Sequence, residues 1–173
     1  MNERTGLTKM KGEPLTLVGN EVKAGDTAPD FAGLNDKLEP VRLSSFKGKV
    51  VVLVSVPSVD TPVCDLETKR FNQEAGKLGN DVVILTLSMD LPFAQARWCA
   101  AAGVENVKLL SDHREASFGK AYGVLIKELR LLARTVFVLD RTGTVRYVQY
   151  VAEITEEPDY DDVLRAVNKV LER

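Results

Sequence analysis

The feature that most constrains the fold is an apolar run, Val50 to Val56, followed closely by Thr61-Pro62-Val63-Cys64. A continuous run of this kind is typical of a strand that is buried on both faces of a parallel sheet. Thr61 is a favourable helix N-cap, and Pro62 falls at the first helical position, where a missing N–H costs nothing. The sequence therefore predicts a buried strand, a short loop and a helix that begins at Thr61.

Cys64 is the third residue of this predicted helix, so its thiol is directed at the positive end of the helix. Such a position stabilises thiolate over thiol, and thiolate is the reactive form of cysteine. The alternative is that Cys64 is a small buried apolar side chain, which is the commonest fate of a free cysteine. The local sequence favours a nucleophile and leaves the structural role open.

Composition limits the class of protein. A chain of 173 residues fits a single domain, 1–173, with a substantial core, and a net charge of −2 gives no reason to expect nucleic acid or an anionic membrane as a partner. The first ten residues lack the apolar region of a signal peptide, and no apolar stretch approaches the length of a membrane span. We therefore expect a cytoplasmic protein.

The chain contains two cysteines, Cys64 and Cys99, and one histidine. A standing structural disulfide is not expected in a reducing compartment, so the two thiols are either inert or a catalytic pair. Two distant cysteines and one histidine also make a poor zinc site. We expect neither a metal nor a cofactor.

Strands and helices alternate along the rest of the chain. Two short alternating stretches flank Lys11-Gly12-Glu13-Pro14 and indicate an N-terminal hairpin. We expect further strands at 81–87, 107–110, 135–139 and 144–151, and helices at 61–79, 92–103, 115–122 and about 163–171. This order predicts an α/β fold with a mixed sheet, in which reactive groups gather where strands end and helices begin.

Three residues in this region resemble a known signature. Pro57, Thr61 and Cys64 form the pattern Pro-x-x-x-Thr-x-x-Cys, which resembles the active-site motif of the peroxiredoxins. The wider stretch 56–71 is similar to the thiol peroxidases, the atypical two-cysteine peroxiredoxins. Four other segments agree in the same order: GDTAPDF at 25–31, ARWCA at 96–100, FGKAYGV at 118–124 and RTVFVLD at 134–140.

The resemblance implies a thioredoxin-like fold, a mixed central sheet flanked by helices, with residues 1–25 as an N-terminal hairpin extension. It also implies a role for each matching residue. Cys64 is then the peroxidatic cysteine and Cys99 the resolving cysteine. Thr61 hydrogen-bonds the thiolate and the peroxide, Pro57 shields the site from water, and Arg134 is the active-site arginine.

The implied activity is the reduction of hydrogen peroxide and alkyl hydroperoxides in antioxidant defence. Cys64 becomes a sulfenic acid, Cys99 attacks it to form an intrachain disulfide, and thioredoxin regenerates the thiols. The resemblance also implies a homodimer. Because both cysteines lie on predicted helices, we expect one or both helix segments to unwind before the sulfur atoms meet.

Plainer interpretations stay open for four of these residues. Cys99 lies on an alanine-rich helix, and its plainer role is that of a core residue. The plainer role of Thr61 is that of a helix cap alone. Pro57 then simply ends its strand, and Arg134 is then an ordinary surface cation.

Two other functions also merit comparison. A thioredoxin-like disulfide oxidoreductase usually needs Cys-x-x-Cys, whereas Pro62-Val63-Cys64-Asp65 supplies one thiol. A peroxide sensor or chaperone that passes its oxidation to a partner uses the same Cys64 chemistry, so the sequence does not exclude it.

Overall fold

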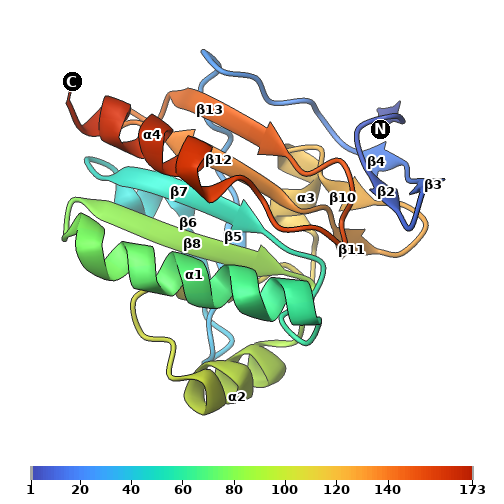
Figure 1. Ribbon diagram of the computed structural model, residues 1–173, viewed down its shortest axis with the longest axis horizontal. Coiled ribbons are helices and arrows are strands. Elements are labelled where there is room, and N and C mark those ends of the chain that lie inside the picture. The colour runs from blue at the N-terminus through green and yellow to red at the C-terminus, as the bar shows by residue number, and fades with distance from the viewer. Residues whose placement is uncertain (1, 173) are drawn as a thin grey trace.

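A seven-stranded sheet forms the centre of the computed structural model, which describes residues 2–172 (Figure 1). The strands are β1 Glu3–Arg4, β2 Lys9–Met10, β3 Glu13–Pro14, β4 Leu17–Val18, β5 Ala32–Leu34, β6 Pro40–Arg42, β7 Val50–Ser55, β8 Val82–Ser88, β9 Lys108–Ser111, β10 Leu125–Ile126, β11 Leu131–Leu132, β12 Thr135–Leu139 and β13 Val145–Tyr150. The helices are α1 Pro62–Leu78, α2 Pro92–Ala102, α3 Ser117–Ala121 and α4 Tyr160–Leu171, with a 3-10 helix at Leu43–Phe46.

The strand order in the central sheet is β13-β12-β7-β8-β9-β5-β6. β7, β8 and β9 are parallel, and the other neighbours pair antiparallel. Every residue of β7 is buried, as predicted from its apolar run, because both faces of the sheet are covered. The mixed sheet flanked by helices confirms the predicted thioredoxin-like fold.

Alternate residues of β7 face two separate apolar layers. Val50, Val52 and Val54 belong to the layer that also includes buried residues of α1 and α4. Val51 and Leu53 belong to the opposite layer, which contains residues of α3 and of the N-terminal strands. Figure 1 shows α1 and α4 side by side on one face of the sheet, with α3 behind it.

The N-terminal hairpin is also confirmed. β2 and β3 pair antiparallel across Lys11 and Gly12, whose φ angles of 50° and 83° both lie in the left-handed region. The segment does more than form a hairpin, because β1 pairs with β4 and β4 pairs with β10. The extension is thereby joined to the main body by a second sheet.

One predicted helix was too long. The sequence predicts helix at 115–122, whereas α3 spans Ser117–Ala121. Ala116 has φ 52°, a left-handed conformation that an α-helix does not accommodate. The buried Asp112 carboxylate accepts the N–H groups of Phe118 and Gly119, and so caps the short helix from outside.

The register of the sheet assembles one functional edge. Ser55, the last residue of β7, lies opposite Leu87 of β8 and Thr135 of β12. β7 and β8 run parallel and β12 runs against them, so two strands end and the third begins at this edge. The loop 56–61 and Arg134 therefore lie together.

Within residues 2–172, no helix is long and apolar enough to span a membrane.

Candidate active site

The start of α1 places Cys64 as the sequence predicts. Thr61 is the N-cap residue, with extended backbone angles, and its Oγ1 accepts the Cys64 N–H at 3.3 Å. Pro62 is the first helical residue and Cys64 is the third. The Thr61 hydroxyl also donates to the Ser58 carbonyl at 3.1 Å. It must turn away from Ser58 before it can donate to a thiolate or a peroxide.

The loop between β7 and α1 is fixed by Asp90, a residue that the sequence analysis missed. Asp90 follows β8, and its carboxylate accepts the Ser58 hydroxyl at 2.7 Å and the Val59 N–H at 2.9 Å. The Ser88 hydroxyl donates to the same carboxylate at 2.6 Å. Pro57 is buried in this loop. The loop therefore has a tertiary anchor as well as the local helix cap.

Cys64 is fully buried, with 0% of its surface exposed. It shares the inner face of α1 with Glu67, Thr68 and Phe71, which follow at helical spacing and are also buried. The Thr68 hydroxyl donates to the Cys64 carbonyl at 2.8 Å. The first turns of α1 therefore hold the thiol against the sheet.

Arg134 is buried and is not the surface cation of the plainer interpretation. It is only 2% exposed, and its Nη1 lies 3.1 Å from Glu67 Oε2. Its Nε and Nη2 donate to the Ile154 carbonyl at 3.0 and 2.7 Å. Glu67 lies three residues after Cys64 on the same helix face, so this hydrogen bond holds Arg134 about one helical turn from the cysteine.

The buried Glu67 carboxyl has an unusual pKa. Burial raises the pKa from its ordinary 4.5 to about 8, although the Arg134 charge and hydrogen bond oppose the rise. Among the residues that the structure describes, Oε1 of Glu67 has no hydrogen-bond partner. The only sequence signal for Glu67 is an acidic residue on the buried face of a predicted helix, one turn beyond the cysteine.

Cys99 lies in the second half of α2, half-buried, and packs against the apolar layer that includes Cys64. Both cysteines are free thiols. Burial, and to a lesser extent the Asp36 carboxylate, raises the pKa of the Cys99 thiol. The structure thus places the two cysteines on neighbouring helices without joining them.

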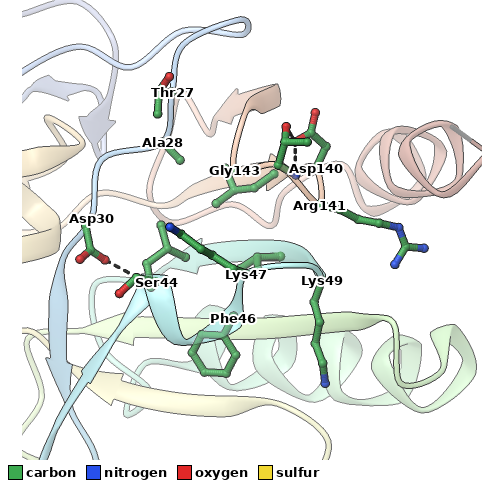
Figure 2. Close-up of a pocket in the computed structure, with 14 residues that line it drawn as sticks. Thr27, Ala28, Asp30, Ser44, Phe46, Lys47, Lys49, Asp140, Arg141 and Gly143 are labelled. Atoms are coloured by element: carbon green, nitrogen blue, oxygen red, sulfur yellow. Dashed lines mark hydrogen bonds between the residues drawn. The ribbon is translucent and has the colours of Figure 1, made fainter.

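A cavity of about 350 Å³ lies at the other end of β7. Figure 2 shows Lys47, Lys49 and Arg141 around it, and its lining includes Val51 near the beginning of the strand. Cys64 follows the opposite end of β7. This cavity is therefore not the site of the thiol chemistry.

Comparison with known proteins agrees with the family that the sequence motifs resemble, and the matches cover most of the chain. The Redoxin family pattern matches residues 23–164. The chain is 57% identical over 161 residues to the "Thiol peroxidase" of Bacillus subtilis, covering 93% of this chain and 96% of that protein. It is also 57% identical to the "Thiol peroxidase" of Halalkalibacterium halodurans, with coverage of 93% and 96%.

Solved structures agree in fold. The crystal structure of a peroxiredoxin-like protein from Aquifex aeolicus has a TM-score of 0.89 and 44% identity, and the match covers 96% of this chain and 98% of that one. A thiol peroxidase from Chromobacterium violaceum, at 24% identity, has a TM-score of 0.83, with coverage of 94% and 95%. The chain therefore belongs to the Redoxin family, within its thiol peroxidase group.

Proposed function

We propose that this chain reduces hydrogen peroxide and organic hydroperoxides with Cys64 as the peroxidatic cysteine and Cys99 as the resolving cysteine. Membership of the thiol peroxidase group makes it a thiol-dependent peroxidase. The observation that carries the assignment is the position of Cys64, at the N-terminus of α1 and one turn from the buried pair of Glu67 and Arg134.

In the first step, the Cys64 thiolate attacks one peroxide oxygen. A sulfur–oxygen bond forms, the oxygen–oxygen bond breaks, and hydroxide or alkoxide leaves and takes up a proton. Negative charge moves onto the leaving oxygen, so fixed donors near that atom lower the barrier. The Thr61 hydroxyl, once turned, and the Arg134 guanidinium are the donors in this proposal.

Arg134 has donors to spare for this role. A guanidinium carries five N–H groups. Three of these donate to protein acceptors, two to Ile154 and one to Glu67, and the other two N–H groups remain for a peroxide. Because the other three are fixed by buried acceptors, the guanidinium needs little reorganisation when the peroxide arrives.

In the second step, Cys99 attacks the Cys64 sulfenic acid. A disulfide forms, the sulfur–oxygen bond breaks, and the oxygen leaves as water with the Cys99 proton. The raised pKa of Cys99 keeps this thiol protonated in the resting structure, so it loses its proton as it attacks, and that proton leaves with the oxygen as water. A dithiol such as thioredoxin then reduces the disulfide, and the cycle serves antioxidant defence in the cytoplasm.

The proposal includes a homodimer. Leu66, Leu91 and Phe93 are large apolar side chains that are 55%, 51% and 64% exposed. They lie where α1 and α2 begin, and both helices follow parallel strands at the same edge of the sheet. Sedimentation of the native chain and of Phe93→Lys tests this arrangement; a dimer that persists in Phe93→Lys contradicts an interface at this surface.

The test of the activity uses fully reduced protein and one equivalent of hydrogen peroxide, followed by intact mass and peptide mapping. We expect a rapid loss of about 2 Da and a peptide that links Cys64 to Cys99. A gain of about 16 Da at Cys64 without the cross-link removes Cys99 from the cycle. No reaction within minutes contradicts the peroxidase.

A second measurement separates an enzyme from a peroxide sensor. We expect continuous peroxide consumption when thioredoxin, its reductase and NADPH are supplied. A stable mixed disulfide between Cys64 and a client protein, with no turnover, indicates the sensor instead.

A further inference from the structure

The two helices that carry the cysteines are held very differently. α1 buries Cys64, Glu67, Thr68 and Phe71 against the sheet. α2 buries only Pro92 and Gln95, both near its beginning. The conformational change that brings the thiols together therefore falls on α2, because moving α1 would dismantle the site where peroxide reacts.

A hollow lies beneath α2. A cavity of about 430 Å³ is lined by Pro92, Gln95, Ala96 and Cys99 from the helix, and by Phe46 and residues of β9 from the sheet side. Side chains that line a cavity lack partners on one side and lose dispersion contacts. Cys99 lines this hollow as well as contacting the apolar layer, so part of its side chain lacks packing partners.

Polar contacts hold α2 at two points. Gln95 Nε2 donates to Ser88 Oγ at 2.9 Å and to the Leu110 carbonyl at 3.0 Å, and so fixes the first half of the helix. The Trp98 indole Nε1 donates to Asp65 Oδ1 at 2.8 Å. Among the described residues, this is the one side-chain hydrogen bond between α2 and α1.

The second contact joins the immediate neighbours of the two cysteines. Asp65 follows Cys64 and Trp98 precedes Cys99. The sequence gives no sign of a tertiary role for Asp65. Its other oxygen, Oδ2, lies 2.9 Å from Lys69 Nζ, which fixes the carboxylate on the surface of α1. A hydrogen bond to an ionised acceptor is among the stronger kinds.

We propose that the hydrogen bond from Trp98 to Asp65 is a latch that keeps the second half of α2 folded, and that its release allows Cys99 to reach the Cys64 sulfenic acid. Trp98 and Asp65 are positioning residues for the disulfide-forming step. The inference rests on the proposed function, because it takes Cys99 as the resolving cysteine. The step itself joins the two sulfur atoms and releases water, as above.

The latch controls a branch in the chemistry. The Cys64 sulfenic acid either condenses with Cys99 or reacts with a second peroxide to give sulfinic acid. While the Trp98–Asp65 hydrogen bond is intact, Cys99 is held away from Cys64. The sulfenic acid then persists longer, and a larger fraction of it reacts with a second peroxide. Because both products come from the same sulfenic acid, their ratio does not depend on how fast Cys64 first reacts.

The test is Trp98→Phe, which keeps an aromatic ring and removes the indole donor. Reduced protein is mixed with rising concentrations of hydrogen peroxide, and disulfide and sulfinic acid are quantified by mass spectrometry. We expect the peroxide concentration that gives equal amounts of the two products to rise about tenfold. The first step, measured as loss of the Cys64 thiol, stays unchanged.

Asp65→Asn is the second variant, since an amide oxygen still accepts the indole N–H but without a charge. We expect its product ratio to lie between those of the native chain and Trp98→Phe. The matched control is Tyr147→Phe, which also removes an aromatic donor to a carboxylate. The Tyr147 hydroxyl, on β13, donates to Asp162 Oδ2, on α4, at 2.5 Å. That variant is expected to keep the native ratio.

An unchanged ratio in Trp98→Phe, or a shift toward sulfinic acid, overturns the latch. Equal shifts in Trp98→Phe and Tyr147→Phe also overturn it, because general loss of stability then explains both. If the native chain itself forms no Cys64–Cys99 disulfide, the proposed resolving role of Cys99 fails and the latch fails with it, whereas a native disulfide with an unchanged ratio in Trp98→Phe overturns the latch alone.

Discussion

The helices α1 and α2 follow neighbouring parallel strands, and each carries one cysteine. The two helices nevertheless differ in length, in capping and in how much of each is buried. α1 runs for 17 residues, begins with a complete N-cap and holds Cys64 in the core. α2 runs for 11 residues, has no side-chain cap at its beginning, and lies over a cavity.

The proposed mechanism gives a reason for this difference. In that mechanism, Cys64 keeps a fixed geometry relative to Arg134 while charge develops on a peroxide, and fixed geometry requires a well-packed helix. In the same mechanism Cys99 moves toward Cys64, and a segment that moves must have a low free energy of opening. Stability is therefore unevenly divided between two helices at one edge of one sheet.

The largest expected effect separates the two thiols. Cys64→Ser removes the nucleophile, and we expect peroxide reduction to fall by about 10⁴-fold or more. Cys99→Ser keeps the first step, so one equivalent of peroxide is still consumed rapidly before thioredoxin-dependent turnover stops. Stopped-flow peroxide assays measure both quantities. Equal loss of the first step in the two variants would contradict the division of roles.

The next effect concerns the anchor of α1. Glu67→Ala removes the acceptor that holds Arg134 Nη1, and we expect the rate constant for Cys64 oxidation to fall about 30-fold, because a misplaced donor stabilises the transition state poorly. Rapid-mixing kinetics against hydrogen peroxide measure this loss. A native rate constant in a folded Glu67→Ala protein would show that Arg134 needs no such partner.

Glu67→Gln, which removes the titrating carboxyl but keeps its shape, changes how stability depends on pH. Folding raises the pKa of Glu67 from 4.5 to about 8, so the native state binds more protons than the unfolded chain between these values. Stability from this group is complete below pH 4.5 and is lost as pH rises toward 8. In urea titrations, Glu67→Gln should lack this decline, whose slope is at most about 1.4 kcal/mol per pH unit.

Hydrogen exchange compares the helices directly. We expect amides in the second half of α2 to exchange about tenfold faster in the disulfide form than in the reduced form, because this segment opens to join the sulfurs. Amides of α1 beyond its first turn should keep their protection, since Glu67, Thr68 and Phe71 stay packed. The reverse pattern would assign the movement to α1.

The smallest expected effect comes from filling the hollow. Ala96→Leu adds apolar volume where α2 faces the cavity, and we expect the cross-linking step to slow about threefold as the helix becomes more stable. Ala100→Leu, on the exposed side of the same helix, is the matched control and should leave the step unchanged. Quenched-flow mass spectrometry measures the disulfide in each protein.

Much of the site could be predicted because it is local. The N-cap Thr61, the helical Pro62 and the place of Cys64 depend on residues within one turn of each other, and the structure confirms all three. The buried strand β7 was also predicted correctly, from its apolar run. The roles of Pro57 and Arg134 came from resemblance to a family, and they stay predictions about chemistry.

The sequence by itself therefore determined the strand, the turn and the helix that present Cys64, because capping and apolar patterning act between near neighbours. Only the tertiary structure decided that Arg134 is buried on Glu67, 67 positions away in the chain, and that Asp90 holds the loop 31 positions before it. It also decided that Trp98 meets Asp65. These contacts depend on the register of β7, β8 and β12, and sheet register is a property of the assembled fold.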